Sequence, residues 1–285
     1  VGIWNRFTGT RVDATGHTSF IIAVAISPDG TTVASCSADK TVKLWSMSGN
    51  MLWSYTHDDT IEGTDYVHDL SYSPDGNKIA AGGDDKVLRV YKVADGTVIK
   101  SIDTGERIRV VEWADNDSIY FSGLNGFLKK IDYASEGYTV VTNLNSSNII
   151  TSIDVHGTSV VTAAVTKVYI YNNSDTQPPV IIDADDTRQV AFSPDGRYIV
   201  TSGRRTTLKI YDLAGTLQQT LGIESNTKQA NGHVCIKRGL GAKTCENIRG
   251  LAWGDVIVSG GWDYSIRMWS DWNLPGLPEV TPVSY

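Results

Sequence analysis

The chain has 285 residues, a formal net charge of −7 at pH 7, and a composition that is 41% apolar and 20% charged. These values are typical of a globular protein with a substantial core. The negative charge argues against non-specific binding to nucleic acid or to an anionic membrane, because such binding depends on lysine and arginine. The longest apolar run, residues 20–26, is much shorter than the roughly 20 residues of a membrane-spanning helix.

A four-residue turn, Ser-Pro-Asp-Gly, occurs three times, at residues 27–30, 73–76 and 193–196. Proline presets the backbone at the second position of a turn, and glycine accepts the positive φ angle at its exit. The flanking segments, such as residues 20–26 and 32–37, are rich in β-branched and other apolar side chains. Each copy therefore predicts a hairpin of two β-strands.

A third strand type follows the hairpins at a regular spacing. It ends in a bulky apolar residue at positions 45, 91, 131, 171, 211 and 269, with spacings of 46, 40, 40, 40 and 58 residues. A fourth, weaker strand is expected at 51–56, 97–102, 138–143, 179–182 and 217–221. Four antiparallel strands (A to D) repeated about every 40 residues are typical of β-propeller blades.

The first repeat carries the residues that reveal the repeat type. It resembles a WD40 repeat through Gly16-His17, the turn at 27–30, Ser35 to Ser37, Asp39 and Leu44-Trp45. The resemblance covers about residues 16–270 and implies an all-β, WD40-like propeller of four-stranded antiparallel blades, formed by residues 1–285 as a single domain.

The resemblance also implies a hydrogen-bond chain within the blade. In the first repeat this chain would link His17, a strand-B serine (Ser35 or Ser37), Asp39 and Trp45.

The other repeats depart from this pattern to different degrees. The second keeps Asp85 but ends in Tyr91, and the sixth keeps Asp263 and Trp269. These departures weaken the polar bracing but leave the strand pattern intact.

The number of blades depends on how the ends of the chain are interpreted. Six inner strands are expected to begin near residues 20, 67, 108, 149, 188 and 248. Residues 1–4 look like another third strand, and residues 10–14 look like a fourth strand that would complete the last blade. We therefore favour six blades. Seven blades would need two more strands from the tail at 271–285, which contains three prolines; strands from a neighbouring chain are a third solution.

One segment, residues 223–247, interrupts the regular repeat with an inserted hairpin. Cys235 and Cys245 lie on its two arms, where they form either a disulfide bond or two free thiols. Its basic residues, Lys237, Arg238 and Lys243, are either a solvated loop or a docking element for an acidic partner. A disulfide bond would place the protein in an oxidising compartment. Three sequons, at Asn116, Asn145 and Asn172, leave open an N-glycosylated protein.

Neither a catalytic nor a metal-binding constellation is evident. The five histidines form no close ligand pair, and no serine-nucleophile motif is present. We therefore predict no enzyme activity and no cofactor.

The partner surface is expected where the B–C and D–A loops emerge at the channel mouth, the usual partner site in the WD40 family. Arginine and tryptophan are the residue types most often central to interfaces. The expected partner-binding residues are Asp84, Arg107, Arg204, Arg205, Trp262 and Tyr264, together with the basic residues of the inserted hairpin. Trp262 has an alternative role in packing between blades.

These observations predict a non-catalytic scaffold that binds a protein or peptide partner, and neither nucleic acid nor membrane. The family resemblance implies a cytoplasmic location. The first alternative is an extracellular, glycosylated propeller that self-assembles into a larger structure, as an oxidised Cys235–Cys245 pair would imply. The second is an enzyme with a site in its channel.

Overall fold

The computed structural model describes residues 1–5, 8, 10–57, 66–133, 138–143, 149–172, 178–184, 187–203, 208–221, 235–236, 244–245, 248–253, 257–261 and 266–269. Within these residues every regular element is a β-strand, and no helix is present that could cross a membrane. The chain divides into two compact units, Val1–Ser147 and Asn148–Tyr285, and hydrophobic clusters are found in each. The single-domain organisation stays a prediction.

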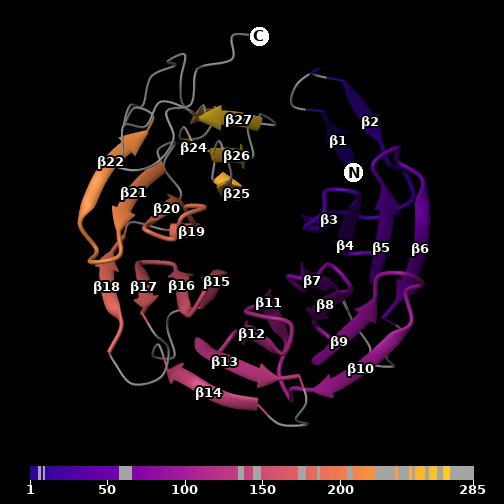
Figure 1. The fold of residues 1–285 in the computed structure, drawn as a ribbon, viewed down its shortest axis with the longest axis horizontal. Helices are drawn as coiled ribbons and strands as arrows, with labels where there is room; N and C mark the ends of the chain where they lie inside the picture. The colour runs from indigo at the N-terminus through magenta and orange to yellow at the C-terminus, as the bar shows by residue number, and fades with distance from the viewer. Residues whose placement is uncertain are drawn as a thin grey trace. The chain divides into compact units, whose positions relative to one another are not determined.

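The first unit contains three four-stranded antiparallel sheets, and the strands of each sheet follow one another in the chain (Figure 1). They are β3 (Ile21–Ile26), β4 (Thr32–Ser37), β5 (Thr41–Ser46) and β6 (Met51–Thr56); β7 (Val67–Tyr72), β8 (Lys78–Gly83), β9 (Val87–Lys92) and β10 (Val98–Asp103); and β11 (Ile108–Trp113), β12 (Ser118–Gly123), β13 (Phe127–Asp132) and β14 (Tyr138–Asn143). A two-stranded sheet, β1 (Gly2–Trp4) and β2 (Arg11–Asp13), precedes them.

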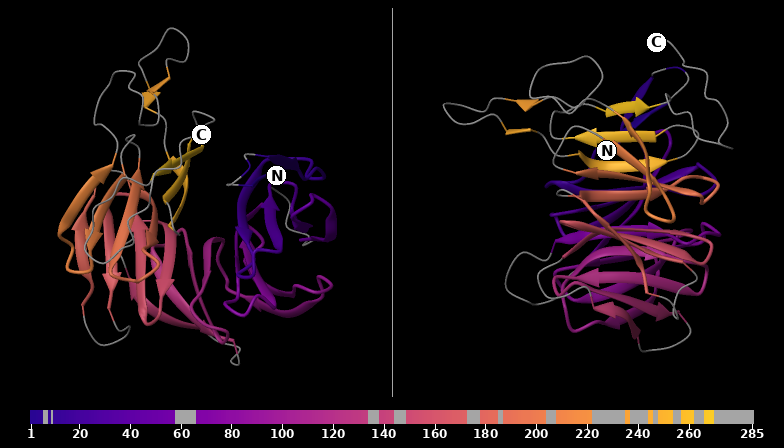
Figure 2. Two further views of the ribbon diagram at one scale, coloured as in Figure 1. Left: turned by 45° about the horizontal axis from the view of Figure 1, so that its top comes forward. Right: turned by 90° about the vertical axis from the view of Figure 1, so that its left-hand side faces the viewer.

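The second unit repeats the pattern, and Figure 2 shows its sheets from two further directions. Its strands are β15 (Ile150–His156), β16 (Ser159–Ala164), β17 (Lys167–Tyr171) and β18 (Val180–Asp183); β19 (Thr187–Phe192), β20 (Tyr198–Gly203), β21 (Leu208–Asp212) and β22 (Leu217–Leu221); and β25 (Ile248–Trp253), β26 (Ile257–Gly261) and β27 (Ile266–Trp269). A short hairpin joins β23 (Cys235–Ile236) to β24 (Thr244–Cys245). The six predicted repeats are thus confirmed by six sheets, of which the last has three strands among the described residues.

The Ser-Pro-Asp-Gly turns join the first and second strands of three sheets by one common network. In each turn the serine Oγ donates to the aspartate Oδ1 two residues later at 2.6 Å. The same Oγ accepts from the backbone N–H five residues later at 3.0 Å. The glycines Gly30, Gly76 and Gly196 have φ angles of +69°, +72° and +69°, which favour glycine. The turn recurs because each of these three hairpins uses the same local hydrogen bonds.

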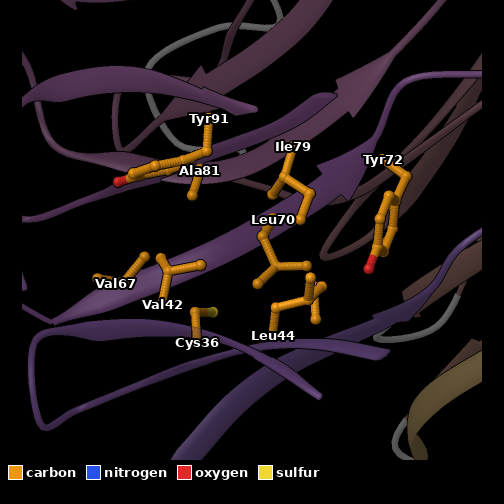
Figure 3. Packing of buried hydrophobic residues seen from close by; sticks show 10 residues of the cluster. Cys36, Val42, Leu44, Val67, Leu70, Tyr72, Ile79, Ala81 and Tyr91 are labelled. Atoms are coloured by element: carbon orange, nitrogen blue, oxygen red, sulfur yellow. The ribbon is translucent and has the colours of Figure 1, made fainter. Parts of the chain in front are cut away.

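Hydrophobic side chains from neighbouring sheets form the core. In the first unit, Leu70 and Tyr72 of β7 pack with Cys36, Val42 and Leu44 of the preceding sheet (Figure 3). These five residues are at most 8% exposed. A single sheet cannot bury both of its faces, so this packing between successive sheets supplies most of the stabilisation.

Side-chain acceptors on one first strand also bond the backbone of the next. In the first unit, the Val111 N–H donates to Asp69 Oδ2 at 2.9 Å. In the second unit, the Phe192 N–H donates to Asp154 Oδ2 at 2.6 Å. Burial raises the pKa of Asp69 to about 7 and that of Asp154 to about 6. These two carboxyl groups therefore link adjacent sheets. Because both are buried, their ionisation in the folded state costs free energy.

Strand β3 differs from β7 because no complete sheet precedes it among the described residues of its unit. Val24 and Ile26 are 56% and 62% exposed, whereas Leu70 and Tyr72, at the corresponding positions of β7, are 4% and 8% exposed. The β1–β2 pair covers another part of the same sheet, where Ile3 contacts the core. The predicted strands at 1–4 and 10–14 pair with each other. Closure of the sixth sheet by residues 10–14 stays a prediction.

Candidate functional site

The candidate site lies at the end of the first-unit sheets where the second-to-third and fourth-to-first strand loops emerge. Because the strands are antiparallel, these two loop types share one end of each sheet, opposite the Ser-Pro-Asp-Gly turns. The β8–β9 loop carries Asp84, and the β10–β11 loop carries Arg107. The other predicted partner-binding residues lie outside the described residues: Arg204, Arg205, Lys237, Arg238, Lys243, Trp262 and Tyr264.

A β-bulge lies at the same position in every first strand. The register shifts across the second residue of β3, β7, β11, β15, β19 and β25. The bulged residues are Ile22, His68, Arg109, Thr151, Arg188 and Arg249. A bulge leaves one residue out of the ladder and changes the direction of its side chain, and bulges are frequent next to functional sites. Among the positions whose side chains the structure describes, His68, Arg109 and Arg188 therefore place a histidine or an arginine at this end of their sheets.

Two bulged residues and the two loop residues meet in a group that we call the Arg–His–Asp cluster: His68, Asp84, Arg107 and Arg109. The His68 Nε2 lies 2.9 Å from Asp84 Oδ1, and the Arg109 Nη1 lies 3.2 Å from His68 Nδ1. The Arg107 Nε lies 3.8 Å from the same Asp84 oxygen, which is an ionic contact rather than a hydrogen bond. Asp84 and His68 thus stand between the two arginines.

These contacts define the protonation of the cluster. Burial lowers the pKa of His68, the hydrogen bond to Asp84 opposes this effect, and the charge of Arg109 adds to it. The imidazole is therefore neutral at pH 7. One tautomer satisfies both contacts: Nε2–H donates to Asp84, and Nδ1 accepts from Arg109. Two arginines against one aspartate leave the cluster with a net charge of one positive unit.

The side chains of the cluster differ in how open they are. Those of His68 and Asp84 are only 9% and 5% exposed, whereas that of Arg107 is 52% exposed. The Nε of Arg109 is buried and has no hydrogen-bond partner among the described residues. The nearby Glu106 does not neutralise the arginines, because its carboxylate is paired with Lys129. The cluster therefore combines a buried, hydrogen-bonded Asp84–His68 pair with two arginines whose guanidinium groups are incompletely paired.

A buried network in the second sheet holds the loop that carries Asp84. The neighbouring Asp85 bonds His57 Nδ1 at 2.9 Å, and the Tyr91 hydroxyl lies 2.5 Å from His57 Nε2. The guanidinium group of Arg89 also bonds Asp85. Both the His57 and the Asp85 side chains are at most 1% exposed. This bracing fixes the backbone of the loop and thereby the position of Asp84.

The first sheet contains the hydrogen-bond chain that the WD40 resemblance implies. His17 Nδ1 lies 2.9 Å from Asp39 Oδ2, and His17 Nε2 lies 2.7 Å from Ser35 Oγ. The Trp45 Nε1–H donates to the same Oγ at 2.8 Å. The participating serine is thus Ser35. Burial opposes the charge on Asp39, but hydrogen bonds from Thr41, the Thr18 N–H and His17 overcome this effect and lower its pKa to about 2.

The second sheet has a histidine–aspartate pair of its own, His57 and Asp85, but its hydroxyl comes from Tyr91 instead of a serine. Ala81 occupies the position that corresponds to Ser35, because it pairs with Arg89 as Ser35 pairs with Lys43. The hydroxyl of Tyr91 then reaches the histidine directly. The sequence did not predict a role for His57, because it lacks the glycine that precedes His17 and lies 28 residues before its aspartate rather than 22.

His68 and Arg109 were also missed from the sequence. Both lie inside strands whose apolar pattern predicts core residues, and a bulge leaves no mark in that pattern. Comparing the second residue of each first strand would have shown the recurring arginines at 109, 188 and 249.

The remaining predicted residues lie in the second unit. Cys235 and Cys245 stand directly opposite each other in the β23–β24 pair, while the disulfide bond itself stays a prediction. Trp269 ends β27, and Asp263 lies outside the described residues. In the described part of the chain, no three His, Cys, Asp or Glu side chains are grouped so that they could hold a metal ion.

Comparisons with known proteins agree with this architecture. A family model described as "WD domain, G-beta repeat" matches residues 10–46, 55–92, 183–212 and 234–270. The structure of U3-55K is similar with a TM-score of 0.75 and 15% sequence identity, over 90% of this chain and 79% of that one. The crystal structure of the RRP9 WD40 repeats is similar with a TM-score of 0.75 and 14% identity, over 90% and 78% of the two chains.

Proposed function

The chain belongs to the WD40-repeat family and has its propeller fold, and from this premise we propose that it is a non-catalytic module that binds a protein or peptide partner. The proposed surface is the end of the sheets that carries the Arg–His–Asp cluster. Fold alone is a weak argument for function, because one fold serves many activities. The proposal therefore depends on the cluster itself.

The observation that carries the proposal is the state of Arg107. Its side chain is 52% exposed, and its ionic contact with Asp84 is 3.8 Å long. Arginine is one of the residue types most enriched at the energetic centres of interfaces. Asp84 and His68 next to it are buried and hydrogen-bonded to each other, so this part of the surface needs little ordering when a partner binds. The predicted residues Arg204, Arg205, Trp262 and Tyr264 belong to the same proposal.

Photo-crosslinking in cells that normally contain the protein tests the proposal. A photoreactive amino acid replaces the exposed Asp103, which ends β10 just before the loop that carries Arg107, in one variant and Arg197 in a control. Arg197 is 53% exposed and lies beside a Ser-Pro-Asp-Gly turn, at the opposite end of its sheet. The proposal expects one protein to be crosslinked from position 103 and not from position 197. Equal crosslinking from both positions, or none from 103, would contradict it.

The hairpin cysteines support a second candidate, an extracellular propeller in a larger assembly. Cys235 and Cys245 are directly paired in the antiparallel β23–β24 ladder, so a disulfide bond between them would require no change of strand register. Intact mass of the native protein, measured with and without reductant, tests this candidate. A gain of two hydrogens on reduction supports it, and an unchanged mass counts against it. The proposed absence of nucleic-acid, membrane and cofactor binding stays a prediction.

A further inference from the structure

We infer that the Arg–His–Asp cluster recognises an acidic side chain of the partner, an aspartate or glutamate carboxylate held by Arg107 and Arg109. The inference rests on the proposed function, since it names the chemistry of the group that would bind at that surface. It assigns a ligand-binding role to Arg109 and a positioning role to His68 and Asp84.

The first argument is the β-bulge. Arg109 is the bulged residue of β11, between Ile108, which pairs with Gly123, and Val110, which pairs with Ser122. Regular pairing would have placed residue 109 in the ladder and on the face set by strict alternation. The bulge instead brings its guanidinium group to His68, the bulged residue of the preceding sheet. The two bulges together therefore build the floor of the site.

The second argument is charge. The cluster has two arginines and one carboxylate, and His68 is neutral because burial lowers its pKa. It therefore keeps one uncompensated positive charge in a chain whose net charge is −7. The carboxylate of Glu106, which precedes Arg107 in the chain, is already paired with Lys129. An added carboxylate would balance the charge of the cluster, whereas a basic or apolar group would not.

The third argument is geometry. The two arginines contact opposite members of one hydrogen-bonded pair, since Arg107 contacts Asp84 and Arg109 contacts His68. Both guanidinium groups thus lie next to the same Asp84–His68 pair. A planar guanidinium group matches a carboxylate with two parallel N–H···O bonds, and such charge-assisted bonds are about twice as strong as neutral ones. The Arg109 Nε, which is buried without a partner among the described residues, would gain an acceptor.

Asp84 and His68 act as positioning residues in this scheme. Asp84 accepts from His68, and His68 in turn accepts from Arg109, so the pair fixes where the Arg109 guanidinium lies. The side chains of both residues are at least nine-tenths buried. Their role differs from that of Arg107, which lies at the edge of the site and is open to solvent.

The test is an NMR titration of the full chain, which follows the side-chain Nε–Hε signals of its arginines. The probe is the blocked peptide acetyl-Asp-Glu-Asp-amide, and the matched control is acetyl-Asn-Gln-Asn-amide. We expect the signals of Arg107 and Arg109 to shift in a saturable manner with the acidic peptide only. The signal of Arg197, which is equally exposed but lies at the opposite end of its sheet, should not move.

Variants sharpen the test. Arg107→Gln should raise the dissociation constant of the acidic peptide about tenfold, whereas Arg197→Gln should leave it unchanged. His68→Gln should weaken binding while the peptide still shifts Arg107, because only the placement of Arg109 is lost. Equal shifts with the amide peptide, or an unchanged dissociation constant in Arg107→Gln, would overturn the inference. Equal shifts with inorganic phosphate at the same concentration would also overturn it, because the site would then be a general anion site.

Different results would contradict the proposed function and the acidic ligand. Crosslinking from position 103 without binding of the acidic peptide would keep the proposed surface and overturn the acidic ligand. Binding of the acidic peptide without any crosslink from position 103 would keep the acidic ligand and overturn the proposed function.

Discussion

Replacing Asp69 with asparagine should make the protein more stable at neutral pH and barely change it in acid. Asp69 lies in β7 and accepts a hydrogen bond from the Val111 N–H of the next sheet at 2.9 Å. Burial raises its pKa from 3.8 to about 7, although hydrogen bonds from the Val111 and Leu70 N–H groups oppose the shift. An asparagine oxygen can accept the same bond without carrying charge.

The magnitude follows from the two pKa values. A difference of one pKa unit corresponds to about 1.36 kcal/mol, so the change from 3.8 to about 7 corresponds to roughly 4 kcal/mol as an upper limit. Asp69 keeps some solvent exposure, and hydration of the charged form reduces this value. We therefore expect Asp69→Asn to raise the free energy of unfolding by about 2 kcal/mol above pH 7.

The stability that Asp69 contributes changes with pH in the opposite direction to that of a paired surface carboxylate. The folded state keeps its proton up to pH 7, whereas the unfolded state loses it near pH 3.8. The wild-type protein therefore loses stability through Asp69 as the pH rises from about 4 to about 7, and the loss is complete above that range. Below pH 4 the protonated aspartic acid and the asparagine should be nearly equivalent.

The assay is urea denaturation of both proteins at several pH values between 4 and 8, followed by tryptophan fluorescence. The difference between the two unfolding free energies isolates Asp69 from all other titrating groups. We expect this difference to grow from near zero at pH 4 to a plateau above pH 7. A difference that is independent of pH, or a variant that is less stable at pH 8, would refute the reasoning.

Three further substitutions test the local networks by the same denaturation assay. Ser35→Ala removes a buried hydroxyl that bonds His17 Nε2 and Trp45 Nε1, and it should lower the free energy of unfolding by about 2 kcal/mol. The control Ser48→Ala, at an exposed position, should lower it by less than about 0.5 kcal/mol. Equal effects of the two substitutions would argue against the two hydrogen bonds. Tyr91→Phe should cost about 1–2 kcal/mol by removing the hydroxyl that reaches the imidazole of the second sheet, and an unchanged midpoint would contradict that bond. Gly83→Ala would place a Cβ in steric conflict with the Tyr66 carbonyl oxygen, so we expect a loss of more than about 2 kcal/mol, and an unchanged free energy of unfolding would contradict this conflict.

The strand pattern was predictable because it follows from strong local signals. The fourth strands expected at 51–56, 138–143 and 217–221 are found with the same bounds, and the other two are displaced by a single residue. The first strands begin at most one residue from their expected starts. Alternation of apolar residues and the turn chemistry of proline and glycine depend only on neighbouring residues, so one sequence is sufficient to show them.

The candidate site was only partly predictable, for a physical reason. Asp84 and Arg107 could be predicted because they are polar residues in loops, where binding residues are often found. His68 and Arg109 were missed because their positions depend on a bulge, which arises from pairing between strands. The role of His57 likewise depends on Tyr91, a residue 34 positions away that meets it only in the folded sheet. Contacts of this kind leave no periodic trace in the sequence.

The central claim is that this WD40 protein binds a partner through the Arg–His–Asp cluster. The most direct measurement is the amount of the partner, once identified by crosslinking, that co-purifies with the full chain carrying Arg107→Gln, compared with Arg197→Gln, by quantitative mass spectrometry. The account predicts that Arg107→Gln reduces recovery of the partner about tenfold while Arg197→Gln leaves it at the wild-type level. Equal recovery with both variants would contradict the account and place the partner surface elsewhere on the molecule.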